Sequence, residues 1–119
     1  MRAVVAHGAG DFRVEEVPDP VLEGGAVVRM EAAGVCAADR MIYKGDSPWE
    51  LSFPFIPGHE NVGTILELDR DAGRRWGVTE GDMVVNEVMV PCGACPLCRR
   101  ERYHLCRNGR HIGSSLPGG

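Results

Sequence analysis

Four cysteines in the last third of the sequence constrain the fold more than any other feature. They are Cys92, Cys95, Cys98 and Cys106, and their spacing is C-x2-C-x2-C-x7-C. Closely spaced thiols can converge on one point where the backbone coils tightly, and the longer gap lets the chain return with the fourth. Four thiolates form a closed tetrahedral zinc site, which is structural because no position remains for substrate. The spacing therefore predicts a structural zinc lobe at about residues 91–107.

Three other interpretations of these cysteines compete with zinc. An iron–sulfur cluster can start with the same spacing, but the bacterial motif ends with a shorter gap and a proline, and no proline follows Cys106. Disulfides are disfavoured because the chain has five cysteines, an odd number, and shows no secretory signal. His104 could replace one thiol as a ligand, although it lies only two residues before Cys106.

Length and composition restrict the function classes. With 119 residues the chain is one domain, which is small for a complete enzyme that binds a dinucleotide. A net charge of −4 and the lack of a basic stripe argue against nucleic acid as a partner. No apolar run reaches the length of a membrane span. Because a four-thiolate zinc site requires reduced cysteines, a cytoplasmic location is expected.

The secondary-structure signals are those of a mostly β protein. Sixteen glycines and eight prolines are spread along the chain and separate short apolar runs, as in a barrel with few helices. Gly45 should end one short helix over residues 37–43, and Gly63 should allow two strands to pack closely. Residues 70–77 are expected to be a polar loop. The expected strands cover residues 3–6, 12–17, 26–33, 61–68 and 83–88.

A second group of residues could carry chemistry. Cys36 follows a predicted strand and opens the short helix, whose N-terminus favours a thiolate. A zinc ion held by Cys36, His59 and one further ligand, with Glu60 adjacent, would keep a position open for substrate. Asp39 could accept the other ring N–H of His59 and fix its tautomer. The alternative is that Cys36 is a small buried apolar residue and that the His-Glu pair is merely solvated.

Other conspicuous side chains have no assigned chemistry. Trp49, Phe53 and Phe55 lie near prolines and could line an apolar pocket or belong to the core. His7 and His111 stand isolated beside or near glycines and are given no role.

Taken together, the motifs resemble the zinc-dependent medium-chain alcohol dehydrogenase family. The resemblance covers essentially the whole chain, residues 1–119, and corresponds to the family's N-terminal GroES-like catalytic domain, a β-barrel with short helices and a four-cysteine zinc lobe. The matching motifs, besides the four cysteines, are Gly34-Val35-Cys36-Ala37-Ala38-Asp39, Gly58-His59-Glu60-Asn61-Val62-Gly63 and Gly81-Asp82-Met83-Val84.

The resemblance implies a role for each matching residue. Cys36 and His59 correspond to catalytic zinc ligands, Glu60 to the acid that can approach or exchange onto the metal, and Asp39 to the partner of the histidine. The four cysteines correspond to the structural zinc site. In this family zinc acts as a Lewis acid on the alcohol oxygen, and hydride passes to NAD or NADP held on a Rossmann domain.

Two positions depart from the family pattern. Ala38 stands where a serine or threonine commonly passes the substrate proton, and Met41 stands where many members carry a relay histidine. Neither side chain can carry a proton. A water chain or a hydroxyl from elsewhere is expected to replace them, or the chemistry is slower or different.

The resemblance also predicts what lies outside these residues. In the family, the third protein ligand of the catalytic zinc and the Rossmann domain lie downstream, and no G-x-G-x-x-G follows a strand here. The chain is therefore expected to be the N-terminal part of a homo-oligomeric enzyme acting on a small alcohol, polyol or sugar, and to be inactive alone. A stand-alone zinc-binding GroES-like module in binding or assembly is the alternative, and a redox-sensing thiol switch ranks last.

Overall fold

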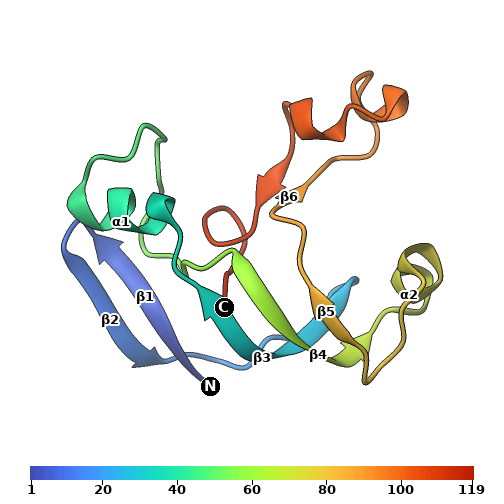
Figure 1. Cartoon of the computed structure of the whole chain (residues 1–119), viewed down its shortest axis with the longest axis horizontal. Helices are drawn as coiled ribbons and strands as arrows, with labels where there is room; N and C mark the ends of the chain where they lie inside the picture. Colours follow the sequence, from blue (N-terminus) through green and yellow to red (C-terminus); the bar gives the residue numbers. More distant parts are fainter.

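The computed structural model describes all residues, 1–119, and consists mainly of short antiparallel strands (Figure 1). Two short α-helices and two single turns of 3-10 helix connect them. The strands are β1 (Arg2–Gly8), β2 (Asp11–Glu16), β3 (Ala26–Gly34), β4 (Glu60–Leu68), β5 (Met83–Val85), β6 (Met89–Val90) and β7 (Arg110–His111). The helices are α1 (Ala37–Lys44) and α2 (Arg70–Trp76), and the 3-10 turns are Cys98–Arg100 and Tyr103–Leu105. The expectation of a mostly β fold with few helices is confirmed.

The first two strands form a hairpin that packs beside α1. Strands β1 and β2 pair antiparallel, and Ala6 of β1 bridges to Phe55 through two backbone hydrogen bonds of 2.9 and 3.1 Å. Ala6, Ile42 of α1 and Phe55 form the buried core, against which Phe12 and Leu51 pack. Phe55 is therefore a core residue. This core fixes the position of α1, whose first residues adjoin the candidate site.

The central sheet has the order β3-β4-β5 and brings the end of β3 against the start of β4. Gly34 is paired with Glu60 at that end of the ladder. A side chain at Gly63 would collide with the backbone carbonyl of Arg29 and with Val28. The predicted close packing at Gly63 is thus confirmed. The three small sheets do not close into a complete ring within these residues.

The prediction of a polar loop over residues 70–77 is wrong, because these residues form α2. The carboxylate of Asp69 caps the helix by accepting hydrogen bonds from the backbone N–H groups of Asp71 and Ala72, both at 3.0 Å. Gly77, with φ of 69°, ends it in the left-handed conformation. The helix has little apolar periodicity, so its stability depends on the N-cap more than on an apolar face.

The expected strand over residues 83–88 is interrupted. Strand β5 ends at Val85, and β6 begins at Met89 and pairs with β7 instead. The cysteine lobe, residues 91–107, lies between β6 and β7 and projects away from the central sheet (Figure 1). Strands β6 and β7 therefore form the base that joins the lobe to the body.

The molecule buries few side chains. Only 11 of 119 residues are buried, and the lobe contributes a single one, Cys106. Apolar burial therefore contributes little to the stability of the lobe, which must be held by its backbone hydrogen bonds and by whatever its thiols bind. Neither α-helix has the length and apolar character that crossing a bilayer requires.

Candidate metal centres

The four lobe cysteines converge on one point. Their sulfur atoms all lie within 4.8 Å of one another. The Sγ–Sγ distances are 3.5 Å for Cys95 and Cys98, 3.9 Å for Cys92 and Cys98, and 4.0 Å for Cys95 and Cys106. A tetrahedron with Zn–S bonds of about 2.3 Å has edges of roughly 3.8 Å. The sulfur arrangement therefore fits a zinc ion with four thiolate ligands.

Backbone N–H groups point at the sulfurs, as expected where thiolates are held. The N–H of Cys92 donates to Cys106 Sγ at 3.4 Å, and that of Cys98 donates to Cys95 Sγ at 3.5 Å. Hydrogen bonds from the backbone at Ala94 and Cys95 lower the pKa of Cys92 to about 6. Burial and the neighbouring thiols raise the pKa of Cys98 to about 12. Four thiolates this close together repel one another, so they cannot all be ionised without a cation. A divalent ion among them offsets this repulsion.

His104 does not belong to this cluster. It is exposed, and its ring stacks edge-on against Tyr103 with 5.9 Å between ring centroids. The donor set of the lobe is thus four sulfurs, without an imidazole.

A second potential ligand group combines Cys36, His59 and Glu60, whose ligand atoms also lie within 4.8 Å of one another. Cys36 is the N-cap of α1, and its backbone N–H donates to Asp39 Oδ2 at 2.8 Å. Glu60 is the first residue of β4, and His59 immediately precedes the strand. Because Gly34 and Glu60 are paired in the β3–β4 ladder, the turn from β3 into α1 carries Cys36 to the same place. One thiol, one imidazole and one carboxylate suit zinc in an open, catalytic type of site.

Gly34 provides the space that this arrangement needs. A Cβ atom at Gly34 would lie 3.0 Å from Glu60 Cβ and would collide with the Glu60 carboxylate. The carboxylate can therefore cross over the strand towards Cys36 only because residue 34 has no side chain.

Asp39 lies where it can orient His59, but the contact is long. Its Oδ1 is 3.7 Å from His59 Nδ1, beyond hydrogen-bonding distance, and this buried oxygen has no hydrogen-bond partner. Both side chains are mostly covered, with exposed fractions of 13% and 18%. Asp39 thus faces the Nδ1 side of the ring and leaves Nε2 available for a metal.

Asn86 was missed in the sequence and holds the His59 segment in place. Its Nδ2 donates to the His59 carbonyl at 3.2 Å, and its Oδ1 accepts from the Asn61 N–H at 3.2 Å. A side-chain amide is the group that can satisfy a neighbouring N–H and C=O together. An asparagine after a strand carried no signal of this role, since its partners lie 25 and 27 residues away.

A cleft of about 630 Å³ opens beside His59. One wall comes from α1 and the segment after it, and the other from β7 and the turn that follows. Of Trp49, Phe53 and Phe55, only Trp49 lines it. The polar lining residues besides His59 are Glu50, Ser52, His111, Ser114 and Ser115. His111, given no role from the sequence, therefore belongs to the surroundings of the candidate site.

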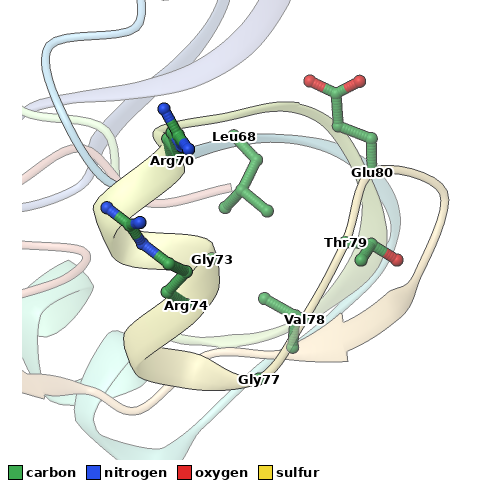
Figure 2. A pocket seen from close by; sticks show the side chains of 8 residues that line it. All are labelled: Leu68, Arg70, Gly73, Arg74, Gly77, Val78, Thr79 and Glu80. Atoms are coloured by element: carbon green, nitrogen blue, oxygen red, sulfur yellow. The ribbon is translucent and has the colours of Figure 1, made fainter.

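A second hollow, about 660 Å³, lies beside α2 and shares no residue with the cleft (Figure 2). Leu68 and Val78 reach into it from opposite sides, and Arg70 and Arg74 project from the helix. Arg74 forms an ion pair with Asp71. This hollow brings together no group of potential metal ligands.

Known proteins are similar to this chain in sequence and in fold. The chain is 45% identical over 116 residues to an erythritol/L-threitol dehydrogenase of Mycolicibacterium smegmatis, which covers 90% of the chain. It superposes on the alcohol dehydrogenase of the archaeon Aeropyrum pernix with a TM-score of 0.86 at 32% identity over 100% of the chain. For a putative zinc-binding dehydrogenase from Sinorhizobium meliloti, bound to NADP, the TM-score is 0.82 at 33% identity over 99% of the chain.

The chain spans about a third of the length of these proteins, namely 32%, 35% and 33% respectively. Residues 23–119 match the alcohol dehydrogenase GroES-like domain. That match covers well over half of the chain and includes both groups of potential zinc ligands. The chain therefore belongs to the alcohol dehydrogenase GroES-like domain family.

Proposed function

We propose that this chain is the catalytic-domain portion of a zinc-dependent, NAD(P)-linked dehydrogenase that oxidises the CH–OH group of an alcohol, polyol or sugar. The observation that carries the proposal is the meeting of Cys36, His59 and Glu60 within 4.8 Å, with His59 on the wall of a cleft. The three similar proteins support it, since each is described as a dehydrogenase. They favour this function over a binding module without catalysis.

The proposed roles of the residues follow from their donor atoms. Cys36, His59 and Glu60 hold the catalytic zinc, and Cys92, Cys95, Cys98 and Cys106 hold the structural zinc. The first set is mixed and adjoins the cleft through His59, so substrate can approach it there. The second set is complete with four sulfurs and has no place for a further ligand.

When bound, zinc supplies a Lewis acid for the substrate oxygen, and NAD or NADP supplies the hydride acceptor. The balance is one alcohol and one oxidised cofactor giving one carbonyl compound, one reduced cofactor and one proton. Two electrons leave the carbinol carbon as hydride, and the hydroxyl proton must reach solvent separately.

The chain's own residues position these partners. Asp39 faces the Nδ1 side of His59 and directs its Nε2 towards the cluster, while Asn86 fixes the backbone on both sides of Glu60. Ala38 lines the cleft but cannot carry a proton. A hydroxyl on the cleft wall or a water chain is proposed to carry it instead, and a solvent isotope effect on turnover would report that path.

Other parts of the proposal concern the rest of the enzyme. Residues 1–119 are proposed to be one GroES-like unit, with the dinucleotide held on a Rossmann domain outside these residues. The 119-residue chain alone is expected to show no turnover. A cytoplasmic homo-oligomer remains the expected state of the whole enzyme.

The test is a steady-state assay on the full-length protein loaded with zinc. Oxidation of erythritol and of butan-1-ol would be followed through reduction of NAD and of NADP. We expect reduction with at least one pair, and loss of it in the His59→Asn variant. Glu80→Gln, an exposed carboxylate beside α2, serves as a control that keeps activity. A zinc-loaded, folded protein that reduces neither cofactor with either alcohol would favour the binding module instead.

A further inference from the structure

The cleft beside His59 carries polar groups that the fold itself does not use. Glu50 and Ser52 lie on the segment after α1, and His111 lies across from them at the end of β7. None of the three side chains takes part in a side-chain hydrogen bond or an ion pair within the protein; only the backbone of His111 is bonded. All three residues are exposed, so a carboxylate, a hydroxyl and an imidazole are hydrated and accessible to a ligand in the cleft.

The two remaining cleft hydroxyls are different, because the local turn uses them. Ser115 Oγ accepts from the His111 N–H at 2.8 Å, and Ser114 and Ser115 Oγ each donate to the His111 carbonyl at 3.4 Å. These bonds fix the backbone on which the His111 side chain is carried. The imidazole is therefore presented from an ordered turn.

We infer that the cleft selects polyhydroxylated alcohols over simple ones, with Glu50 and His111 as the residues that bind the additional hydroxyl groups. This inference rests on the proposed dehydrogenase function. A carboxylate accepts hydrogen bonds from substrate hydroxyls, and an imidazole can both donate and accept. Between these groups, Ala38, Ile42 and Ile112 offer apolar surface for the carbon chain. No residue of this cleft other than His59 is among the proposed zinc ligands.

The chemistry predicts discrimination by hydroxyl number. A polyol replaces the water around Glu50 and His111 with its own hydroxyls, whereas an alcohol with one hydroxyl leaves those groups without partners on the substrate. Because Glu50 and His111 are exposed and stay hydrated when a mono-alcohol binds, the preference comes from the hydrogen bonds that a polyol gains and not from rejection of the simple alcohol. Erythritol and butan-1-ol have the same number of carbons, so they isolate this effect.

The experiment compares the full-length protein with its Glu50→Leu and Glu50→Gln variants. Because Glu50 is exposed, loss of its hydrogen bond to substrate corresponds to about 1 kcal/mol, or roughly fivefold in affinity. We expect Glu50→Leu to lower kcat/KM for erythritol about fivefold, mainly through KM, and to change that for butan-1-ol less than about twofold. Glu50→Gln, which keeps an acceptor, should recover part of the loss. Glu80→Leu is the matched control and should change neither ratio.

A binding measurement without turnover separates this inference from the proposed function. Saturation-transfer NMR of erythritol on the cofactor-free protein should show contact, and Glu50→Leu should weaken it. If no alcohol is oxidised but Glu50-dependent binding is observed, the dehydrogenase proposal fails and the binding site stands. Equal effects of Glu50→Leu on both alcohols, or no effect on erythritol, would overturn the inference while leaving the activity intact.

Discussion

The two clusters of potential metal ligands differ in how the chain assembles them. The lobe cluster draws all its donors from one short segment, Cys92 to Cys106, whose backbone also donates to the sulfurs. The second cluster joins Cys36 to His59 and Glu60 through the pairing of β3 with β4. Local coiling makes the first cluster, and sheet register makes the second. We therefore expect the lobe to depend on its metal for structure, and the second cluster to keep its shape without one.

The largest effect should follow the loss of a lobe ligand. Replacing Cys98 in Cys98→Ser leaves three thiolates in a segment whose only buried residue is Cys106. Structural zinc contributes about 10–16 kcal/mol of apparent binding free energy in small peptides, so the lobe should unfold locally. Zinc content should fall by one per chain, and lobe amides should lose protection in hydrogen exchange.

The control for this variant is Cys36→Ser, which removes a thiol from the other cluster. It should keep the lobe zinc and the lobe's exchange protection. Unchanged protection in Cys98→Ser would contradict a metal-dependent lobe.

The opposite pattern is expected for His59→Asn, which changes the second cluster. Activity of the full-length protein should fall by more than about a hundredfold, since partners of metal ligands alone are worth 10–100-fold. Thermal stability should change little because His59 does not belong to the buried core. The measurement is kcat/KM together with the melting temperature. A large fall in melting temperature with activity retained would reverse the assignment of the two clusters.

A smaller effect should come from Asp39→Asn. The amide oxygen can still accept from the Cys36 N–H, so the cap of α1 is kept, but the negative charge 3.7 Å from His59 Nδ1 is lost. We expect a loss of zinc affinity at the second cluster of about tenfold. Asp39→Ala, which also removes the capping-box hydrogen bond from the Cys36 N–H, should cost about 1 kcal/mol of stability in addition. Competition with a chromogenic chelator measures the affinity, and identical affinities for wild type and Asp39→Asn would exclude the positioning role.

The smallest effect concerns neither cluster. Asp69→Ala removes the N-cap of α2 and should lower the free energy of unfolding by about 1 kcal/mol in urea denaturation. Zinc content and its retention should be unchanged. A change in either would show that the two clusters are coupled to α2.

The same contrast explains how much could be predicted from sequence. The lobe could be predicted because the spacing of four cysteines is local information. The short strands could be predicted because glycines at turns separate short apolar runs. Helix α2 was missed because Arg70–Trp76 is rich in charge and has no apolar stripe; its capping residue, Asp69, is the feature that could have identified it. The cleft could not be foreseen, since Glu50 and His111 are brought to opposite walls only by the tertiary fold.

The most direct test of the two-cluster account is zinc stoichiometry of the full-length protein before and after dialysis against a chelator. We predict two zinc ions per chain, of which one, in the four-thiolate lobe, resists the chelator while the other is removed. Cys98→Ser should abolish the resistant ion and His59→Asn the removable one. Iron in place of zinc, or a metal-free protein with oxidised lobe thiols, would contradict the account.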